Sequence, residues 1–310
     1  MASKGPGKAY RTGMTLAELF RVFPDNATAE AWFAVQRWGD EPHCPHCGSF
    51  NVQTGAAHKT MPYRCRDCRK RFSVRTATVM ERSNLGYQTW AIAIYLLTTS
   101  LKGVSSMKLH RDLGITQKSA WHLAHRIRRA WEADSSPFAG PVEADETFVG
   151  GKESNKHAAK KLRAGRGKVG KTPVIGVKDR ATNQVRATVV ADTKQATLQP
   201  FVRQHLGPDT EVYTDEWWGY RGLPNHTAVK HKVGHWVDGQ AHTNGLESFW
   251  AMLKRGYHGT YHKMSPKHLA RYLGEFEGRH NNRPADTLEQ MRRLARGMLG
   301  KRLSYAELIG

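Results

Sequence analysis

The sequence predicts an α/β protein in which two small N-terminal modules precede a larger mixed domain. Three patterns carry this prediction: two cysteine pairs early in the chain, a helix-turn-helix pattern after them, and alternating strand and helix patterns from Pro141 onward. A chain of 310 residues also exceeds the usual size of one domain. We therefore expect five consecutive segments: N-terminal helices (1–40), a cysteine ribbon (41–80), a helix-turn-helix-like segment (81–135), the mixed domain (136–290) and a helical tail (291–310).

The charge balance is strongly basic. Lys and Arg together number 48 against 27 Asp and Glu, which gives a formal net charge of +21 at pH 7. An excess of this size predicts a polyanionic partner, and nucleic acid is the leading candidate. The sequence has no run of about 18 apolar residues, and its N-terminus lacks the apolar core of a signal peptide. We therefore expect a soluble, cytoplasmic protein without a membrane partner.

Helical patterns lie on both sides of the cysteines. Before them, two short helices are predicted in "TLAELFRVFPDNATAEAWFAVQRWG", the second capped near Asp25 and Asn26. After them, "YQTWAIAIYLLTT" predicts an apolar helix that is too short to span a bilayer. We expect the first two helices to pack on the ribbon.

The four cysteines form two close pairs, Cys44 with Cys47 and Cys65 with Cys68, separated by residues 48–64. This spacing suits two knuckles that converge on one tetrahedral Zn²⁺. The alternative, two disulfides, is disfavoured in a reducing compartment and by the missing secretion signal. Basic residues around the second pair could contact phosphates or could be solvated: Arg64, Arg66, Arg69, Lys70 and Arg71. We expect the metal to supply much of the stability of this small module.

A helix-turn-helix pattern follows in "SSMKLHRDLGITQKSAWHLAHRIRRAWE", with its turn at Gly114-Ile115-Thr116. If this pair of helices binds DNA, the residues at the start of the second helix are the candidates for reaching base edges: Gln117, Lys118, Ser119 and His122. The alternative is an ordinary helical hairpin that links two domains. The turn-forming residues Glu132 to Pro141 predict a domain boundary after it.

The mixed domain begins with a strand in "VEADETFVG". Its alternation places Glu143, Asp145 and Thr147 on one face, with Val142, Ala144 and Phe148 on the other. Further strands are predicted in "TPVIGVKD", "QVRATVVAD" and "TEVYTDEWWGY", the last ending at Asp215, and a helix in "QATLQPFVRQHL". An acid at the carboxyl end of a strand lies where open α/β sheets tend to place their chemistry.

The segment "HTNGLESFWAMLKRGYHGTYHKM" predicts an amphipathic helix. Its buried stripe is Leu246, Phe249, Trp250, Leu253 and Tyr257. Glu247 and Lys254 flank this stripe on nearly the same face. Alone, Glu247 would be a surface carboxylate with a weak ion-pair partner. Together with Asp145 and Asp215, it supplies the hard oxygen ligands that a pair of divalent cations requires for phosphoryl transfer.

Three blocks of sequence carry a family resemblance: "VEADETFVGGK", "YTDEWWGYRGL" and "HTNGLESFWAMLKRGYHGTYHKMSPKHLARYLGEFEGRHNNR". In this order they resemble the DDE transposases of bacterial insertion sequences that carry an N-terminal zinc ribbon, the ISXO2-like group. The resemblance spans nearly the whole chain. It implies a ribonuclease-H-like catalytic domain in which Asp145, Asp215 and Glu247 bind two Mg²⁺ or Mn²⁺ ions, with Lys254 near the DNA.

The resemblance also implies a reaction and its partners. The expected reaction is hydrolysis at transposon ends, followed by attack of the freed 3′-hydroxyl on target DNA through two-metal phosphoryl transfer. The expected partners are double-stranded DNA, as terminal inverted repeats and as target, and further copies of the chain in a synaptic complex. Such a protein would be associated with the nucleoid.

Several residues near these acids are alternative ligands. Glu143, Glu146 and Glu216 adjoin the expected ligands; strand alternation points Glu146 away from Asp145 but does not exclude Glu143. Asn244 stands three residues before Glu247 and is the alternative third ligand. His231, His235 and His242 could form a metal site, although scattered histidines in a basic chain more often contact phosphate or pack structurally.

The basic segment between the first two strands of the mixed domain has two interpretations. Gly165 to Thr172, "GRGKVGKT", has the spacing of an ATP-binding phosphate loop, but it runs into a strand-like stretch instead of a helix. We expect a basic loop over Lys152 to Lys171 that follows the DNA backbone through Lys160, Lys161 and Arg163. The competing functions are a non-catalytic zinc-ribbon and helix-turn-helix regulator and an ATP-dependent DNA protein. Cleavage that requires Mg²⁺ but no ATP would separate the three.

Overall fold

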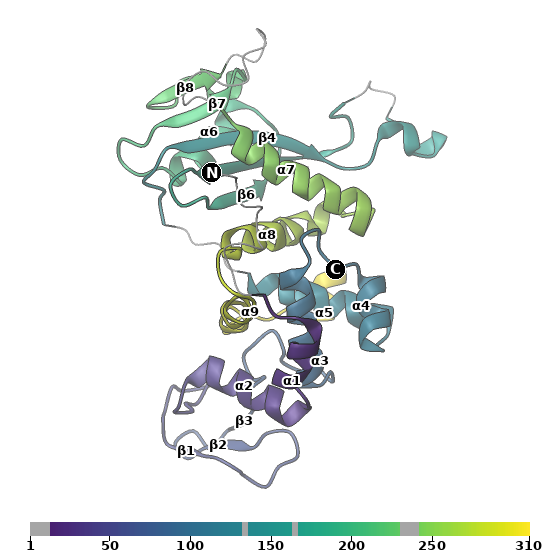
Figure 1. The fold of residues 1–310 in the computed structure, drawn as a ribbon, viewed down its shortest axis with the longest axis vertical. Coiled ribbons are helices and arrows are strands. Elements are labelled where there is room, and N and C mark those ends of the chain that lie inside the picture. The colour runs from purple at the N-terminus through teal and green to yellow at the C-terminus, as the bar shows by residue number, and fades with distance from the viewer. Residues whose placement is uncertain (1–12, 132–135, 163–166, 230–241) are drawn as a thin grey trace. The chain divides into compact units, whose positions relative to one another are not determined.

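A computed structural model of the chain describes residues 13–131, 136–162, 167–229 and 242–310. The chain divides into two units (Figure 1). Unit 1 contains Met1–Glu132 and Asn282–Gly310, and unit 2 contains Ala133–Asn281. The sequence suggested consecutive segments with a separate tail at 291–310. In the structure, the residues after Asn281 instead return to the N-terminal unit.

Unit 1 is mainly helical. Its helices are α1 (Leu16–Val22), α2 (Asn26–Trp38), α3 (Tyr87–Thr99), α4 (Ser106–Leu113), α5 (Gln117–Ala130), α9 (Thr287–Arg296) and α10 (Tyr305–Ile309). As expected, α2 begins after Asp25, whose carboxylate accepts a hydrogen bond from Thr28 N at 2.7 Å. Trp90, Ile94 and Leu97 of α3 are fully buried in the core of the unit. Burial on several sides explains why α3 is apolar around most of its circumference. Among the described residues, no helix has both the length and the apolar character needed to span a membrane.

The C-terminal residues complete this helical core. Met291 and Leu294 of α9 are buried in the same cluster as Trp90 of α3. Val79 N donates to Met298 O at 3.2 Å, and the backbone of Ala77 accepts a hydrogen bond from Gly300 N at 3.0 Å. Because apolar packing and backbone pairing both involve the end of the chain, unit 1 is complete only when residues 282–310 are in place.

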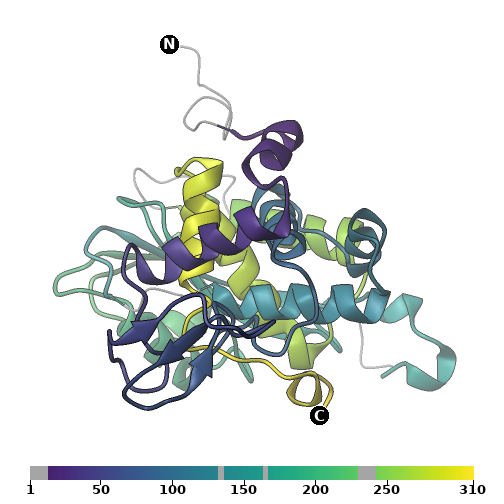
Figure 2. The ribbon, with the colours of Figure 1, turned by 90° about the horizontal axis from the view of Figure 1, so that it is seen from below.

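A small ribbon of three short strands completes unit 1. It consists of β1 (Val52–Gln53), β2 (Tyr63–Cys65) and β3 (Arg71–Phe72), paired antiparallel in the order β1-β2-β3 (Figure 2). The ring of Trp38, at the end of α2, lies 4.9 Å from that of Tyr63 and 5.9 Å from that of Phe72. Helix α2, the second of the two helices predicted there, therefore packs on the ribbon.

The four cysteines converge at one end of the ribbon. Their sulfur atoms lie within 4.8 Å of one another, with 3.6 Å between Cys44 and Cys68 and between Cys47 and Cys65. None of the four is in a disulfide. A tetrahedral site with Zn–S bonds of about 2.3 Å has sulfur atoms roughly 3.8 Å apart, so this cluster is compatible with a zinc ribbon.

Backbone amides support the cysteine cluster. His46 N donates to Cys44 Sγ and Cys68 N to Cys65 Sγ, both at 3.4 Å. The hydrogen bond from Cys68 N lowers the pKa of the Cys65 thiol to about 7, which favours the thiolate that a metal binds. The distances between the sulfur atoms, close to those of a tetrahedral zinc site, indicate that these four residues would hold a zinc ion with little rearrangement.

Unit 2 is built on a five-stranded mixed sheet. Its strands are β4 (Val142–Val149), β5 (Thr172–Asp179), β6 (Val185–Val189), β7 (Val212–Asp215) and β8 (His226–Val229), in the order β6-β5-β4-β7-β8. The β6/β5/β4 pairs are antiparallel, and the β4/β7 and β7/β8 pairs are parallel. The four strands predicted from the sequence are present. Strand β8 was not predicted.

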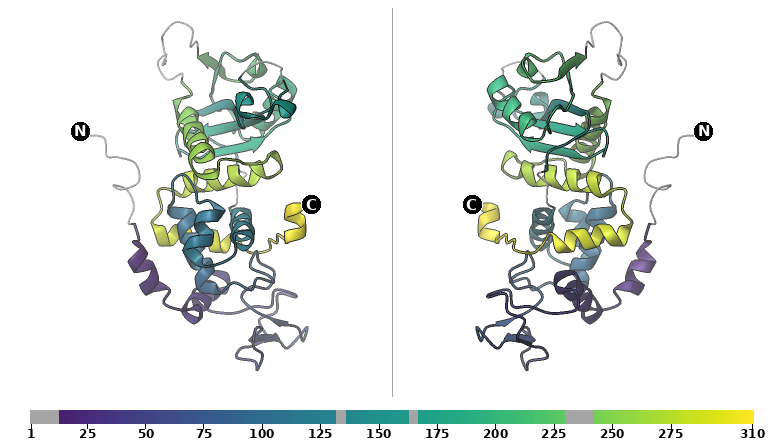
Figure 3. Two further views of the ribbon diagram at one scale, coloured as in Figure 1. Left: turned by 90° about the vertical axis from the view of Figure 1, so that its right-hand side faces the viewer. Right: turned by 90° about the vertical axis from the view of Figure 1, so that its left-hand side faces the viewer.

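Helices cover both faces of this sheet (Figure 3). The helical elements are η1 (Glu153–Asn155), η2 (Ala158–Lys160), α6 (Gln195–Gln204), η3 (Trp218–Tyr220), α7 (Asn244–Gly256), η5 (Tyr257–Tyr261) and α8 (Pro266–Asn282). On one face, Val142 and Ala144 pack with Leu198 of α6. On the other, Val149 packs with Leu246 and Phe249 of α7. The side chains of β4 therefore alternate between the α6 face and the α7 face.

We expect one tightly bound zinc per chain in protein purified under reducing conditions. Cys44→Ser should release it and unfold the ribbon, because little apolar surface is available to replace the metal. Unit 2 should stay folded, since it has its own core. Metal analysis combined with calorimetry tests this: one zinc and two separable transitions are expected, with only one transition altered by the substitution.

Candidate active site

Two carboxylates lie on neighbouring parallel strands, Asp145 within β4 and Asp215 at the end of β7. The register of β4 and β7 pairs Val142 with Val212 and Glu143 with Tyr213. Continuing it by two residues places Asp145 beside Asp215, on strands about 4.8 Å apart. Residues paired in parallel register point to the same face of a sheet, so both acids lie on the α7 face. The sheet thus brings together two acids that are far apart in sequence.

Asp145 is largely buried beneath α7. Trp250 Nε1 of α7 donates a hydrogen bond to Asp145 Oδ2 at 3.0 Å. Burial raises the pKa of Asp145 to about 8, and the nearby carboxylates of Glu146 and Asp215 add to this shift. Trp250 fits here because the residue paired with Asp145 on β5 is Gly176, where an added Cβ would lie 2.7 Å from the indole ring.

The bond to Asp145 shows which side of α7 faces the acids. Glu247 and Lys254 lie three residues before and four residues after Trp250, so all three side chains lie on one side of the helix. Glu247 is exposed, and its Oε1 accepts a hydrogen bond from Thr243 Oγ1 at 3.5 Å. Within the described residues, the four cysteines are the group whose ligand atoms converge; the three acids do not form a comparable cluster.

Glu146 belongs to the opposite face, as strand alternation predicted. Its Oε2 accepts a hydrogen bond at 2.6 Å from Tyr220 OH, a fully buried side chain in the core of the α6 face. Burial raises the pKa of Glu146, although the bond from Tyr220 opposes this shift. Asp215 Oδ1 accepts from Trp217 N at 3.0 Å, and the next residue along the chain, Glu216, is exposed.

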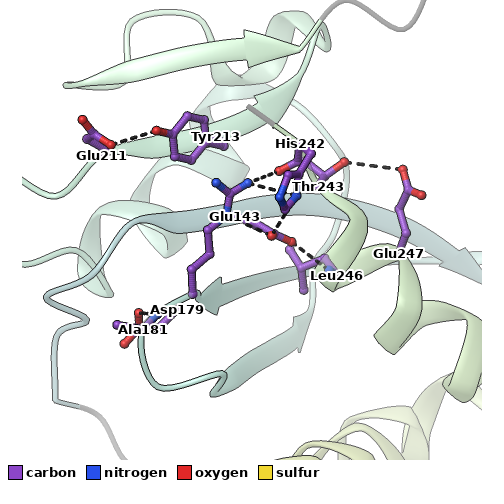
Figure 4. Close-up of polar contacts among 10 residues, drawn as sticks. Glu143, Asp179, Ala181, Glu211, Tyr213, His242, Thr243, Leu246 and Glu247 are labelled. Atoms are coloured by element: carbon purple, nitrogen blue, oxygen red, sulfur yellow. Dashed lines mark hydrogen bonds and ion pairs between the residues drawn. The ribbon is translucent and has the colours of Figure 1, made fainter. Parts of the chain in front are cut away.

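Glu143 has protein partners for both of its oxygens. Oε1 accepts from Arg180 Nε at 3.0 Å, and Oε2 accepts from Leu246 N at 3.0 Å (Figure 4). His242 Nδ1 lies 3.4 Å from Oε1. His231 and His235, the other histidines considered as ligands, fall outside the described residues. Asn244, the alternative third ligand, is exposed at the first position of α7.

A basic cavity of about 660 Å³ opens around the end of β4 in unit 2. Its lining includes Glu146 together with five side chains that are or can become cationic: Lys152, Lys168, Lys171, Lys254 and His258. Lys254 comes from α7, and the first three lysines come from the segment between β4 and β5. The cavity therefore places positive charge at the end of β4, the strand that carries Asp145, as a polyanion would require.

The rest of that segment lies only partly within the described residues. Lys160 and Lys161 are exposed, whereas Arg163 lies outside them. Of the phosphate-loop pattern, Thr172 is the first residue of β5, so a strand follows the loop where a helix would be needed to bind ATP.

The helix-turn-helix pattern is present as α4, a turn at 114–116 and α5. Two of its four candidate residues make local contacts: Gln117 Nε2 donates to Ser106 Oγ at 2.9 Å, and Ser119 N donates to Thr116 Oγ1 at 3.1 Å. The second bond is an N-cap of α5. Gln117 and Thr116 are exposed all the same.

The other two candidates contact the C-terminal segment. Lys118 Nζ lies 4.4 Å from the centre of the Tyr305 ring, and His122 Nε2 lies 3.1 Å from Leu303 O. Arg126 Nε is also 3.1 Å from Leu303 O. The start of α5 is thus partly occupied by the end of the chain, which local sequence patterns could not reveal.

Sequence patterns missed the residues that hold the acids. Trp250 was assigned only to the buried stripe of its helix, and Tyr220 and Arg180 were not considered. The available signals were a tryptophan three residues after Glu247 and a glycine, Gly176, in a strand pattern, which often marks a close approach. Neither signal indicates which residue the tryptophan or the glycine would contact.

The high pKa of Asp145 predicts a particular dependence of stability on pH without added divalent metal. Folded Asp145 keeps its proton up to about pH 8, whereas in the unfolded chain it ionises near pH 4. Folded protein therefore binds more protons between these values, and its stability falls as pH rises. The asparagine of the Asp145→Asn variant cannot ionise, so the variant should lose less stability than the wild type as pH rises.

Thermal unfolding from pH 5 to pH 8 tests this. The Tm of unit 2 in Asp145→Asn, minus that in the wild type, should increase by more than about 2 °C over this range. Added Mg²⁺ should reduce the difference at pH 8. A Tm difference that stays constant from pH 5 to pH 8 would contradict the raised pKa of Asp145.

Comparison with known proteins identifies the family of this chain. Residues 137–281 match the ISXO2-like transposase domain. The chain is 27% identical over 274 residues, 83% of this chain and 91% of the relative, to an uncharacterized protein in transposable element ISH50 of Halobacterium salinarum. It is 32% identical over 103 residues, 32% of this chain and 82% of the relative, to an uncharacterized transposase-like protein of Haemophilus influenzae. The matched segment coincides with unit 2, and the chain belongs to the ISXO2-like transposase family.

Proposed function

We propose that this protein is a DDE-type DNA transposase of an insertion sequence. It binds the terminal inverted repeats, cleaves the DNA there and joins the freed 3′-hydroxyl to target DNA. The observation that carries the proposal is the alignment of Asp145 in β4 with Asp215 at the end of the neighbouring parallel strand β7, beneath the α7 face that carries Glu247. Membership of the transposase family supports the same reaction.

The topology of unit 2 supports a ribonuclease-H-like assignment. Numbered along the chain within the unit, its strands have the order 3-2-1-4-5, with the second strand antiparallel to the first. The first and fourth strands are the adjacent parallel pair. Asp145 and Asp215 lie on this pair.

The donor set fits hard divalent cations. Asp145, Asp215 and Glu247 offer carboxylate oxygens, which Mg²⁺ and Mn²⁺ prefer. The carboxylates close to Asp145 raise its pKa, so a bound cation would relieve their repulsion. When bound, two such ions supply an activated water or 3′-hydroxyl and stabilise the leaving oxygen. Glu247 would join the two aspartates through its own side chain, because it already lies on the α7 side that faces them.

The chain's own residues would bind and orient the DNA. The lysines of the basic cavity, Lys254 among them, would contact phosphates next to the acids. Trp250 keeps Asp145 oriented through its hydrogen bond. The buried indole also excludes water from one side of this carboxylate.

Unit 1 would recognise the element ends. The zinc ribbon and the start of α5 are the candidate DNA-binding surfaces, with Gln117, Lys118, Ser119 and His122 as the side chains closest to the bases. Two DNA ends must be joined in one event, so we propose that copies of the chain assemble on them and that the protein is nucleoid-associated. A non-catalytic regulator would bind the same ends without cleaving them.

Replacing each acid by its amide should remove chemistry but not DNA binding. Asp145→Asn, Asp215→Asn and Glu247→Gln keep the side-chain shape and remove the ligand charge, so Mg²⁺-dependent cleavage should fall by about 1,000-fold or more. Lys254→Ala should cost about tenfold, the size of one charge-assisted contact. Cleavage assays on the element's own ends, with affinity measured in parallel, test this.

Three outcomes would revise this assignment. Full cleavage by Glu247→Gln, together with a loss in Asn244→Ala, would move the third ligand to Asn244. End binding by the wild type without any cleavage in Mg²⁺ or Mn²⁺ would favour the non-catalytic regulator. Cleavage that requires ATP would exclude both the transposase and the non-catalytic regulator.

DNA binding should divide by region. Alanine at Gln117 and Lys118 should lower the preference for terminal-repeat DNA over random DNA. Alanine at Lys160, Lys161 and Arg163 should weaken both about equally and reduce the salt slope by about 0.9 per lost contact. Binding titrations at several salt concentrations measure both effects. Equal losses from the two sets would mean that α4 and α5 form only a structural hairpin.

A further inference from the structure

Glu143 is a buried acid that the proposed chemistry does not use. Its side chain is 2% exposed, and it lies on the same face of β4 as Asp145, two residues earlier. Its carboxylate reaches across to the start of α7, where Oε2 accepts from Leu246 N at 3.0 Å (Figure 4). This bond joins residues that are 103 positions apart in the sequence.

Helix α7 lacks the usual cap of its own. Its N-cap residue, Thr243, makes no side-chain cap hydrogen bond. The first N–H groups of a helix have no partner within it, and a carboxylate beside them is favoured by the helix dipole. Glu143 therefore serves as the N-cap that Thr243 does not provide, from a different element.

Arg180 makes this burial of Glu143 possible. Its Nε donates to Glu143 Oε1 at 3.0 Å, which pairs the buried charge. Its Nη2 donates to the backbone carbonyl of His242, immediately before the N-cap of α7. One ion pair thus holds both the chain entering the helix and the first turn.

Gly245 leaves the space that this contact requires. A Cβ added there would lie 2.7 Å from Glu143 Oε2 and 2.5 Å from Lys178 Nζ. A side chain at this position would push the carboxylate and the helix apart. The contact is therefore open to perturbation from both partners.

Two bonds from β4 define the register of α7. Glu143 accepts a hydrogen bond from Leu246 N, and Asp145 accepts one from Trp250 Nε1. The two acids are two residues apart on the strand, and the two donors are four residues apart on the helix. Together they fix the position of the first turns of α7 along β4 and the rotation of the helix about its own axis. Glu247 is the residue directly after the first of these donors.

We propose that Glu143 is a positioning residue: by capping α7 it sets the place of Glu247 relative to Asp145 and Asp215. The inference rests on the proposed function, in which Glu247 completes the cation site. Glu143 itself does not contact the cation, because Arg180 and Leu246 N already occupy its oxygens.

Glu143→Gln is the direct test, since it keeps the size of the side chain and removes the charge that pairs with Arg180. Hydrogen exchange of the peptide covering residues 244–250 should become faster, while exchange in β7 should not change. The half-saturating Mg²⁺ concentration for cleavage should rise about tenfold, the usual size of such an indirect effect. Affinity for the DNA ends should stay within about twofold.

Glu211→Gln is the matched control. Glu211 lies in the same unit. Its carboxylate accepts a hydrogen bond from Tyr213 OH at 2.8 Å, whereas that of Glu143 accepts one from α7. The same chemical change there should leave exchange in 244–250 and the Mg²⁺ dependence unaltered. A variant that only reduced the folded fraction would lower the cleavage rate without moving the half-saturating Mg²⁺ concentration.

Gly245→Ala attacks the same contact from the helix and should reproduce both effects. If the two substitutions break one contact, their effects on Mg²⁺ dependence should not add in the double variant. Faster exchange with unchanged Mg²⁺ dependence would overturn the positioning role and leave the proposed function standing. Unchanged exchange would overturn the cap itself. A wild type that does not cleave would count against the proposed function, while the exchange experiment would still report on the cap.

Discussion

The burial of Asp145 among other carboxylates is the constraint on which the structure of unit 2 depends. A charged group in such a place is unfavourable, and its raised pKa expresses that cost. The surroundings limit the cost by giving each neighbouring acid a separate partner. Glu146 is turned to the other face and bonded to Tyr220, and Glu143 is paired with Arg180. What remains is the desolvated carboxyl group of Asp145 beside Asp215, whose ionisation a bound divalent cation would favour.

The same constraint explains details that look unrelated. Gly176 leaves room for the indole of Trp250, whose N–H group reaches Asp145. Gly245 leaves room for the carboxylate of Glu143. Gly176 lies on β5 and Gly245 on α7, and both face the interface between the sheet and α7, so the close approach of sheet and helix is built into the backbone. Because α7 carries Glu247 and Lys254 on the side that meets the strand, this approach also determines where the third acid and the basic cavity lie.

Unit 1 depends on two different contributions. The ribbon has few buried apolar residues and brings its four cysteines together, so a metal would supply the energy that a small core cannot. The helical part draws on α9 and the residues after it, with Met291 and Leu294 in its core. Unit 2 is therefore inserted in the sequence between two parts of unit 1, and the candidate DNA-binding helices reach their final packing only when residues 282–310 are in place.

Local patterns in the sequence determined the ribbon spacing, the alternation of β4 and the buried stripe of α7, because each depends on neighbours a few residues away. They also limited the candidate acids to a short set. The tertiary structure decided the roles within that set: Glu143 caps a helix, Glu146 faces the opposite core and Asp145 lies beside Asp215. It also decided that Lys118 and His122 contact the C-terminal segment. The physical reason is that these roles depend on partners far away in the sequence, as with Lys118 and Tyr305. The period of a strand or helix fixes which face a side chain occupies but not what it meets there.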